Sequence, residues 1–389
     1  VVAMPPAATV APLVEANNAF GFALWVKART PTGNLAMSPA SLTLALTMTW
    51  AGARAETATQ MQRTLQLRAA ADSVVPAWGS YAAALQSGDR KLELRVANRL
   101  FGEQAYELQQ PFLEQIERAF GAPLEKVDFR TQPEPARTRI NSWVAEQTNQ
   151  RIKDLLPGGA ITPDTRLVLV NAIYFLAEWL APFDKAQTRD VPFFTAKAAS
   201  KPVSTMHQIG TFRRGKAAGV SLLELPYQGD DAAMLIVLPD AIDGLAAVER
   251  SLGAKQLATW RAALTEQQVA VALPRFEIDP ATPLSLAGPL EALGMTDAFS
   301  RSADFSGIAK RTATDQELFI SSVFHKAFVK TDEKGTEAAA ATAVVMAVKG
   351  ALPPPATAFK ADHPFLFFIV EKASGLVLFI GRVADPAAK

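Results

Sequence analysis

The sequence predicts an α+β protein with helices in its first third and strands in the rest. Apolar residues recur at helical spacing early in the chain, whereas from Leu167 onward short apolar runs have the length and composition of strands. Hydrophobic residues make up 49% and charged residues 20% of the 389 residues, which is enough for a sizeable core. Because no clear linker or internal repeat divides the chain, we expect one domain over residues 1–389.

The helical part consists of amphipathic stretches with recognisable start and stop signals. Ser38 and Pro39 form a helix-start signal, and Gly52 interrupts the apolar pattern that follows. The expected helices cover residues 12–29, 38–65, 111–121 and 136–152, with a late one over 283–294.

The strand-rich part contains two hairpin signals. The pair of apolar runs 222–227 and 232–239 flanks "QGDD", and the pair 364–371 and 376–383 flanks "KASG". Further strands are expected over residues 166–175 and 267–278.

Charge and composition exclude several classes of function. The net charge is +1, which gives no reason to expect a nucleic acid or membrane partner. No apolar run reaches the roughly 18 residues of a membrane span. There is no cysteine, which excludes disulfides and thiol catalysis. The first ten residues lack a basic segment and a long apolar stretch, so we expect either no signal peptide or one already removed.

The sequence contains no local signature of an enzyme. His207, His325 and His363 lie far apart, and the motifs HExxH, CxxC and GxSxG are absent. A catalytic triad that uses one of these histidines and is assembled only in the folded protein remains an alternative, although no local motif supports it. "GTFRRGKA", residues 210–217, resembles a phosphate-binding loop but has Ala217 in place of Ser or Thr, so we interpret it as an exposed basic hairpin turn. We therefore predict no enzymatic activity, metal site or cofactor.

The run "DEKGTEAAAATAVVMAVKG", Asp332 to Gly350, allows two interpretations. Alanine favours a helix, for which Thr336 would be the N-cap. Small and β-branched residues equally suit a segment that lies in a loop and later enters a sheet. The local sequence does not decide between them.

Several motifs resemble the serpin family in the family's own order, from about Leu13 to Val383. They are "NLAMSPASLTLAL", "ANRLF", "VLVNAIYFLAEWLAPFDKAQT", "ELPYQGDDAAMLIVLPD", "LPRFEI", "LGMTDAF" and "HKAFVKTDEKGTEAAAAT". The resemblance implies three β-sheets surrounded by helices and an exposed reactive-centre loop, here approximately residues 333–358. A prokaryotic-looking inhibitory member is expected.

In this family a target serine protease cleaves the loop and forms an acyl-enzyme, and the cut loop then inserts into the main sheet. Successive residues of a strand face opposite sides, so the resemblance places Thr336 and every second residue after it on the buried face. Glu337 lies on the other face. The resemblance assigns the loop hinge to Glu333, Gly335, Thr336, Glu337, Ala338, Ala339, Ala340, Ala341 and Thr342.

Family spacing also implies which bond the protease cleaves. The seventeenth residue counted from Glu333 is Lys349, so the reactive bond is Lys349–Gly350. A lysine at this position suits a trypsin-like protease, whose specificity pocket is anionic. The stretch that follows is longer than usual in the family, so Met346 and Val348 remain alternative cleavage positions. In a further alternative, Lys349 is only a solvated surface charge.

The resemblance implies two further polar clusters. The shutter, where the strands must part, comprises Ser38, Ser41, Asn171 and His325. Its expected key contact is an Asn171–His325 hydrogen bond, and the alternative for His325 is an ordinary buried core histidine. The breach, where the loop enters the sheet, comprises Trp179, Arg275 and Glu333. Residues 73–91 have basic side chains only at the last two positions, so we expect no activation by polyanions.

The sequence thus predicts a single-use, monomeric inhibitor of trypsin-like serine proteases that forms a covalent acyl complex. A non-inhibitory binding or carrier protein with the same fold is the alternative. We expect a secreted or periplasmic location, with no nucleic acid or membrane partner.

Overall fold

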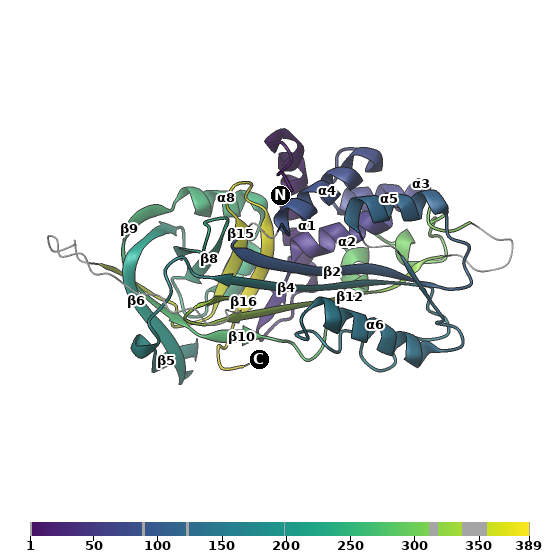
Figure 1. The fold of residues 1–389 in the computed structure, drawn as a ribbon. Coiled ribbons are helices and arrows are strands. Elements are labelled where there is room, and N and C mark those ends of the chain that lie inside the picture. The colour runs from purple at the N-terminus through teal and green to yellow at the C-terminus, as the bar shows by residue number, and fades with distance from the viewer. Residues whose placement is uncertain are drawn as a thin grey trace.

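Helices cover the main sheet on both sides in the computed structural model, and a second strand-rich region lies at one end (Figure 1). The structure describes residues 2–87, 90–121, 124–197, 199–310, 318–336 and 356–388. Helices α1 to α5 gather on one side of the main sheet and α6 lies on the other (Figure 1). This arrangement confirms the α+β prediction.

The helices agree with the sequence signals at most positions. Ser38 caps α2 by accepting a hydrogen bond from the Ser41 N–H at 3.2 Å, and α2 ends at Gly52 as expected. α4 was not expected from periodicity, and Gly79 lets it pack closely, since a Cβ there would lie 2.2 Å from the Ala119 carbonyl oxygen. The helices are α1 Ala7–Ala28, α2 Pro39–Ala51, α3 Ala55–Thr64, α4 Ala71–Leu85, α5 Gln110–Phe120, α6 Pro133–Gln147, α7 Leu245–Arg250, α8 Ala254–Ala262 and α9 Ala287–Glu291.

The main sheet has the order β10-β12-β13-β4-β2-β3, with β11 paired to β12 at its side. β4 and β12 pair directly and in parallel over most of their length, while the short β13 lies between them at one end. The strands are β2 Leu92–Glu103, β3 Glu125–Val127, β4 Leu167–Glu178, β10 Phe276–Ile278, β11 Leu284–Ser285, β12 Ile320–Thr331 and β13 Gly335–Thr336.

The remaining strands form one hydrogen-bonded network with the order β1-β16-β15-β8-β7-β6-β9-β14, and β5 pairs with β6. The long β6 pairs with β7 near its end and with β9 and β5 before it, so it joins two sheets. Together with the main sheet these make the three sheets expected. The strands are β1 Leu35–Met37, β5 Arg189–Ala196, β6 Ala199–Ala217, β7 Val220–Pro226, β8 Ala232–Pro239, β9 Thr265–Pro274, β14 Thr357–Lys360, β15 Phe365–Glu371 and β16 Val377–Val383.

Two local predictions need correction. Residues 210–217 are the end of strand β6 and not a turn, because their backbone pairs with β7 and β9; the turn follows at Gly219, whose φ of 77° suits glycine. The late helix expected over 283–294 is short, because Leu284 and Ser285 pair with β12.

Two apolar layers hold these elements together. The larger one lies between the main sheet, the covering helices and the second region. The smaller one lies between α6 and the outer face of the main sheet, where Phe101 and Trp143 meet edge to face at 5.6 Å. No helix in the described part of the chain is long and apolar enough to cross a membrane.

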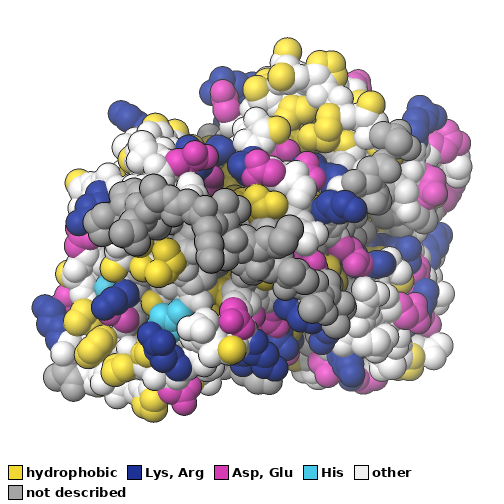
Figure 2. All heavy atoms as spheres, turned by 60° about the vertical axis from the view of Figure 1, so that its left-hand side comes forward, with side chains coloured by type: hydrophobic (Ala, Val, Ile, Leu, Met, Phe, Trp, Pro, Cys, Tyr) yellow, Lys and Arg dark blue, Asp and Glu magenta, His cyan; other side chains and the backbone are white. Residues whose placement is uncertain are grey.

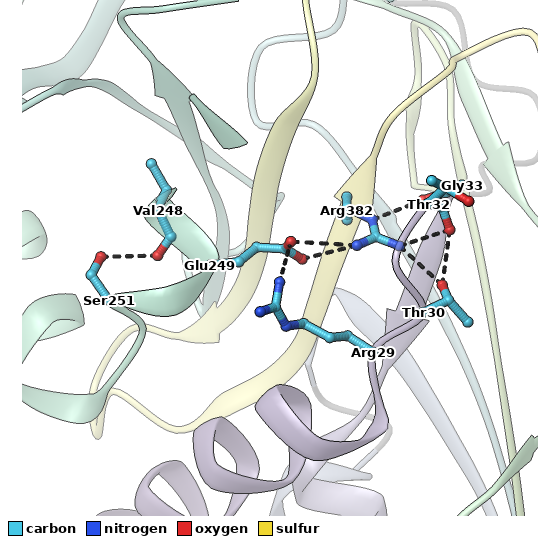
Figure 3. Close-up of polar contacts among 8 residues, drawn as sticks. All are labelled: Arg29, Thr30, Thr32, Gly33, Val248, Glu249, Ser251 and Arg382. Carbon is cyan, nitrogen blue, oxygen red and sulfur yellow. Dashed lines mark hydrogen bonds and ion pairs between the residues drawn. The ribbon is translucent and has the colours of Figure 1, made fainter. Parts of the chain in front are cut away.

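A buried ion cluster joins the two ends of the chain. Arg382 on β16 is 2% exposed and donates to both carboxylate oxygens of Glu249, at 3.2 and 3.4 Å, and to the Gly33 carbonyl oxygen at 2.8 Å (Figure 3). Arg29 donates to the same carboxylate at 2.7 Å. Glu249 therefore neutralises two arginines, one of which is fully desolvated.

We expect Glu249→Ala to destabilise the fold by about 3–5 kcal/mol, because the substitution leaves Arg382 buried without its counter-ion. The measurement is the midpoint of denaturant unfolding. The control is Glu15→Ala, whose partner Arg68 is 85% exposed, and for which we expect a change within about 0.5 kcal/mol. Equal effects of the two substitutions would contradict this account of the cluster.

Candidate functional site

The site centres on the place where β13 enters the main sheet between β4 and β12. Thr336 pairs with Thr331 of β12 on one side and with Ala177 of β4 on the other, and Gly335 pairs with Glu178. Beyond this point β4 and β12 pair with each other. The chain thus begins a strand whose continuation would have to separate its two neighbours.

The side chain of Thr336 lies in the interior. It is 0% exposed, and its hydroxyl and that of Tyr227 form a hydrogen bond of 2.7 Å. Burial raises the pKa of Tyr227, so its hydroxyl stays protonated. Thr336 is therefore a buried polar residue whose hydroxyl is hydrogen-bonded.

Gly335 is required by close packing at this entry point. A Cβ at this residue would lie 2.1 Å from the Ala177 carbonyl oxygen and 2.6 Å from the Glu178 Cα. The sequence suggested glycine as a flexible pivot, and the structure adds that no side chain fits between β13 and β4.

The expected breach residues meet beside β13. The Trp179 ring stacks on Tyr227 with centroids 4.6 Å apart and planes 7° from parallel. Its indole N–H donates to the Asp332 carbonyl oxygen at 2.9 Å, and its backbone N–H donates to the Lys334 carbonyl oxygen at 2.7 Å. Trp179 thus fixes the turn that leads into β13.

Glu333 is held from two sides. The Arg275 guanidinium donates to its carboxylate through Nε at 2.8 Å, and the Thr188 hydroxyl donates to the same oxygen. Burial alone would raise the pKa of Glu333, but the hydrogen bonds from Arg275 and Thr188 outweigh it, so the pKa lies below its usual value. The Phe183 N–H donates to the Glu333 carbonyl oxygen at 2.8 Å and completes the anchor.

The expected shutter residues also come together, in the middle of the sheet. His325 of β12 lies opposite Asn171 of β4, and its Nδ1 is hydrogen-bonded to the Asn171 Oδ1. Its Nε2 accepts the Ser38 backbone N–H at 3.0 Å, at the start of α2. The ring therefore connects two strands and the helix behind them.

These contacts define the charge state of His325. Because Nε2 accepts a hydrogen bond, the ring proton is on Nδ1 and the imidazole is neutral. Burial lowers the pKa of His325 to about 3, in agreement with this assignment.

Asn98 belongs to the shutter and was missed by the sequence reasoning. It lies on β2 directly opposite Asn171, which donates to it, and its own amide donates to the Ser41 carbonyl oxygen at 3.0 Å. Asn171 also donates to the Ser41 hydroxyl at 2.6 Å. The only sequence signal was an amide inside the apolar strand "ANRLF". Tyr227 and Thr188 at the breach were also missed, although both lie inside the quoted motifs "ELPYQGDDAAMLIVLPD" and "VLVNAIYFLAEWLAPFDKAQT".

Several predicted residues lie outside the described part of the chain. They are the rest of the hinge (Glu337, Ala338, Ala339, Ala340, Ala341 and Thr342), the predicted reactive bond Lys349–Gly350 and its alternatives Met346 and Val348. The chain is described again from Ala356, and β14 pairs in parallel with β9 from Thr357 to Lys360. The approximate loop 333–358 thus starts at the breach and ends in an ordered strand.

The described residues contain no group of three or more His, Asp or Glu side chains that could hold a metal ion. His207, His325 and His363 lie in separate places: on β6, on β12 and between β14 and β15.

Comparison with known proteins covers nearly the whole chain. A family model described as serpin (serine protease inhibitor) matches residues 15–386. Leukocyte elastase inhibitor of Bos taurus is 40% identical over 384 residues, with 96% of this chain and 99% of that protein covered.

Solved structures agree at the level of the fold. Uncleaved ovalbumin superposes with a TM-score of 0.87 at 31% identity, covering 96% of this chain and 100% of the other. Human thyroxine-binding globulin in complex with thyroxine gives 0.87 at 29% identity, covering 97% and 99%. The expectations of a prokaryotic type and of a secreted or periplasmic location gain no support from these mammalian relatives. The match along residues 15–386 and the shared fold show that the chain belongs to the serpin family of serine protease inhibitors.

Proposed function

We propose that this protein is a single-use inhibitor of trypsin-like serine proteases that traps the acyl-enzyme by inserting its cleaved loop into the main sheet. The observation that carries the proposal is β13, whose two residues already pair with both β4 and β12. The protein acts as a monomer and as a substrate, not as an enzyme, and needs no cofactor or metal.

The proposed reaction begins as ordinary proteolysis. The protease serine attacks the carbonyl carbon of Lys349, the bond to the Gly350 nitrogen breaks, and the new amine leaves with a proton from the protease histidine. The acyl-enzyme then joins the protease to the new end of the loop. If the loop inserts before water attacks the ester, the protease is carried along and its active site is distorted.

The register of β13 supports one specific position for the proposed inserted strand. Because Thr336 lies opposite Ala177, continuation of the same pairing places residue 346 opposite Leu167 at the far end of β4. Lys349 follows just beyond that end. The protease would then move along the length of β4, on the order of 35 Å. No proline interrupts residues 335–351, so every residue supplies a ladder donor.

Continuation of the same register would bring Thr342 opposite Asn171. Thr342 shares the face of Thr336, so its hydroxyl would lie where the inserted strand separates Asn171 from His325. Polar groups that lose a buried partner need a replacement. The hydroxyl of a threonine at this position can both donate and accept a hydrogen bond. It could therefore pair with the Asn171 and His325 side chains after insertion, which supports the proposal.

Two relatives favour variants of the proposal. The name leukocyte elastase inhibitor suggests elastase-type targets, which would suit cleavage at Val348 or Met346 if the loop register differs. Thyroxine-binding globulin favours the alternative of a carrier protein. A covalent complex with trypsin, seen by denaturing electrophoresis near the summed masses, separates the inhibitor from the carrier.

We expect Thr336→Arg to convert the inhibitor into a substrate. The substitution removes the bond to Tyr227 and places a charge in a closed interior position, which costs several kcal/mol. Insertion slows, deacylation wins, and the stoichiometry of trypsin inhibition rises well above one. The matched control is Glu337→Arg on the predicted outward face, which should keep the stoichiometry of the natural protein. If the natural protein, Thr336→Arg and Glu337→Arg all had the same stoichiometry of inhibition, the assignment of Thr336 to the buried face of the inserted strand would be refuted.

We expect Lys349→Glu to abolish inhibition of trypsin-like proteases and to leave the melting temperature nearly unchanged, because a loop charge contributes little to folding. Mass spectrometry of the C-terminal peptide released by trypsin from the natural protein should give Gly350 as its first residue. A peptide that starts at another residue would show that the reactive bond lies elsewhere in the loop.

We expect cleavage between about Ala343 and Leu352 to raise the melting temperature. Each added ladder hydrogen bond contributes about 0.5–1.5 kcal/mol, whereas a nick in an ordinary loop adds only disorder.

His325→Ala should lower the melting temperature of both the intact and the nicked form, since it removes the ring that joins β12 to β4 and α2. The measurement is a pair of melts recorded side by side, and a nicked form that melts no higher than the intact one would favour the carrier.

A further inference from the structure

The outer face of the sheet formed by β5, β6, β9 and β14 carries a groove. Strands β5, β6 and β9 lie at the left of Figure 1, and this side comes forward in Figure 2, where hydrophobic and basic side chains surround histidine side chains at the lower left. The groove has a volume of about 730 Å³, which is within the range of small-molecule sites. None of the described side chains that line it belongs to the shutter or the breach.

The floor of the groove is apolar because alanines occupy the outward positions of its central strand. In β9 the run "VAVAL" buries Val269, Val271 and Leu273 in the interior. Ala270 and Ala272 alternate with them and therefore face outward. The solvated face of an antiparallel sheet usually carries polar side chains. Two successive outward alanines instead leave a hollow with an apolar floor.

The register of the strands extends this floor on both sides of β9. Ile209 of β6 and Ala358 of β14 lie on either side of Ala270. Ile209 is 71% exposed, although isoleucine is among the most often buried residues. Val191 of β5 lines the same groove. A ligand on these residues would remove apolar area, above all that of Ile209, from water.

The described residues that line the groove include three basic side chains, which lie next to this floor. His207 of β6 and Lys360 of β14 lie on either side of Ala272, one row of the sheet away from Ile209 and Ala270. Arg189 of β5 lies opposite Thr205, one row further along. Cross-strand neighbours share a face of the sheet, so the three basic side chains and the alanines face the same side.

The positive charge of the groove is not neutralised within the described part of the chain. Arg189 and Lys360 are exposed and form no ion pair or side-chain hydrogen bond with a described residue. Asp362 also lines the groove, but its Oδ1 is hydrogen-bonded to the adjacent His363 at 2.8 Å. Asp190 follows Arg189 and alternates to the opposite face of β5. The groove therefore favours a negatively charged ligand.

The ring of His207 is oriented by its own strand. Its Nδ1 lies 3.0 Å from the Thr205 carbonyl oxygen, and because a carbonyl oxygen can only accept, Nδ1 carries a proton. Nε2 has no partner among the residues that the structure describes. As an imidazolium, the ring would offer a second N–H from this nitrogen to an anionic group.

We propose that this groove is a binding site for a small amphipathic anion, namely a carboxylate on an apolar chain. The carboxylate lies among the three basic side chains, and the apolar body covers the alanine floor and Ile209. From β5 to β14 there are three inter-strand spacings, about 14 Å in all. An extended chain of roughly ten to twelve carbons covers this distance. The site goes beyond the proposed inhibitory function and does not depend on it.

The experiment titrates dodecanoate into the uncut protein and follows binding by calorimetry. We expect one equivalent to bind with a dissociation constant below about 1 mM. Dodecyltrimethylammonium, which has the same chain and the opposite charge, should bind at least about tenfold more weakly, because it meets uncompensated positive charge. Equal affinities for the two compounds would overturn the proposal, since they would show adsorption of the chain alone.

Variants test the charges separately from the floor. The double variant Arg189→Gln with Lys360→Gln should bind dodecanoate roughly tenfold more weakly, since it removes two partly exposed ionic contacts. The matched control, Lys216→Gln with Arg301→Gln, removes the same net charge at exposed positions outside the groove and should keep the natural affinity. An unchanged affinity of the first variant, or an equal loss in both, would contradict the site.

Filling the floor gives an independent test of the location. Ala270→Trp keeps all three basic side chains and should abolish binding, and methyl NMR of Ile209 in the natural protein should show a shift on addition of dodecanoate. If Ala270→Trp does not fold, the charge variants and the Ile209 signal still decide, because they alter only exposed groups or none. If dodecanoate does not bind and the Arg189→Gln, Lys360→Gln variant instead slows formation of a covalent complex with trypsin, the groove contacts a protein and the proposal is wrong.

Discussion

The parallel pairing of β4 with β12 is the contact on which the rest of the structure depends, because it closes a sheet that already holds the first two residues of another strand between them. His325, Asn171 and Asn98 form one buried chain of hydrogen bonds across three strands, and Ser38 and Ser41 connect it to the fully buried α2. Such a chain is stable only while every member is paired. Separating β4 from β12 would therefore leave buried polar groups without partners unless new groups replaced them.

The two ends of the loop are fixed by different physical means. At the first end, Glu333 is held as a carboxylate by Arg275 and Thr188, and Thr336 is buried against Tyr227, so β13 is registered before any cleavage. At the second end, the four-residue strand β14 pairs in parallel with β9.

Electrostatics separates the roles of the two buried histidines. His325 has one acceptor and one donor as partners, so its ring is neutral and its pairing does not change at physiological pH. His363 has two acceptors as partners, and the hydrogen bonds to them hold the pKa of its ring above the ordinary value although burial lowers it.

The sequence by itself determined the α+β class, most helices and strands, and the family, and it singled out residues such as Trp179 and His325 whose motifs stand out. Only the tertiary structure decided that β13 is already paired on both sides, that Asn98 and Tyr227 complete the two clusters, and that residues 210–217 form a strand. The physical reason is that periodicity reports how each residue is buried within its own element. Hydrogen-bond partners and protonation states come from residues that are distant in the chain and meet only when the sheets are packed.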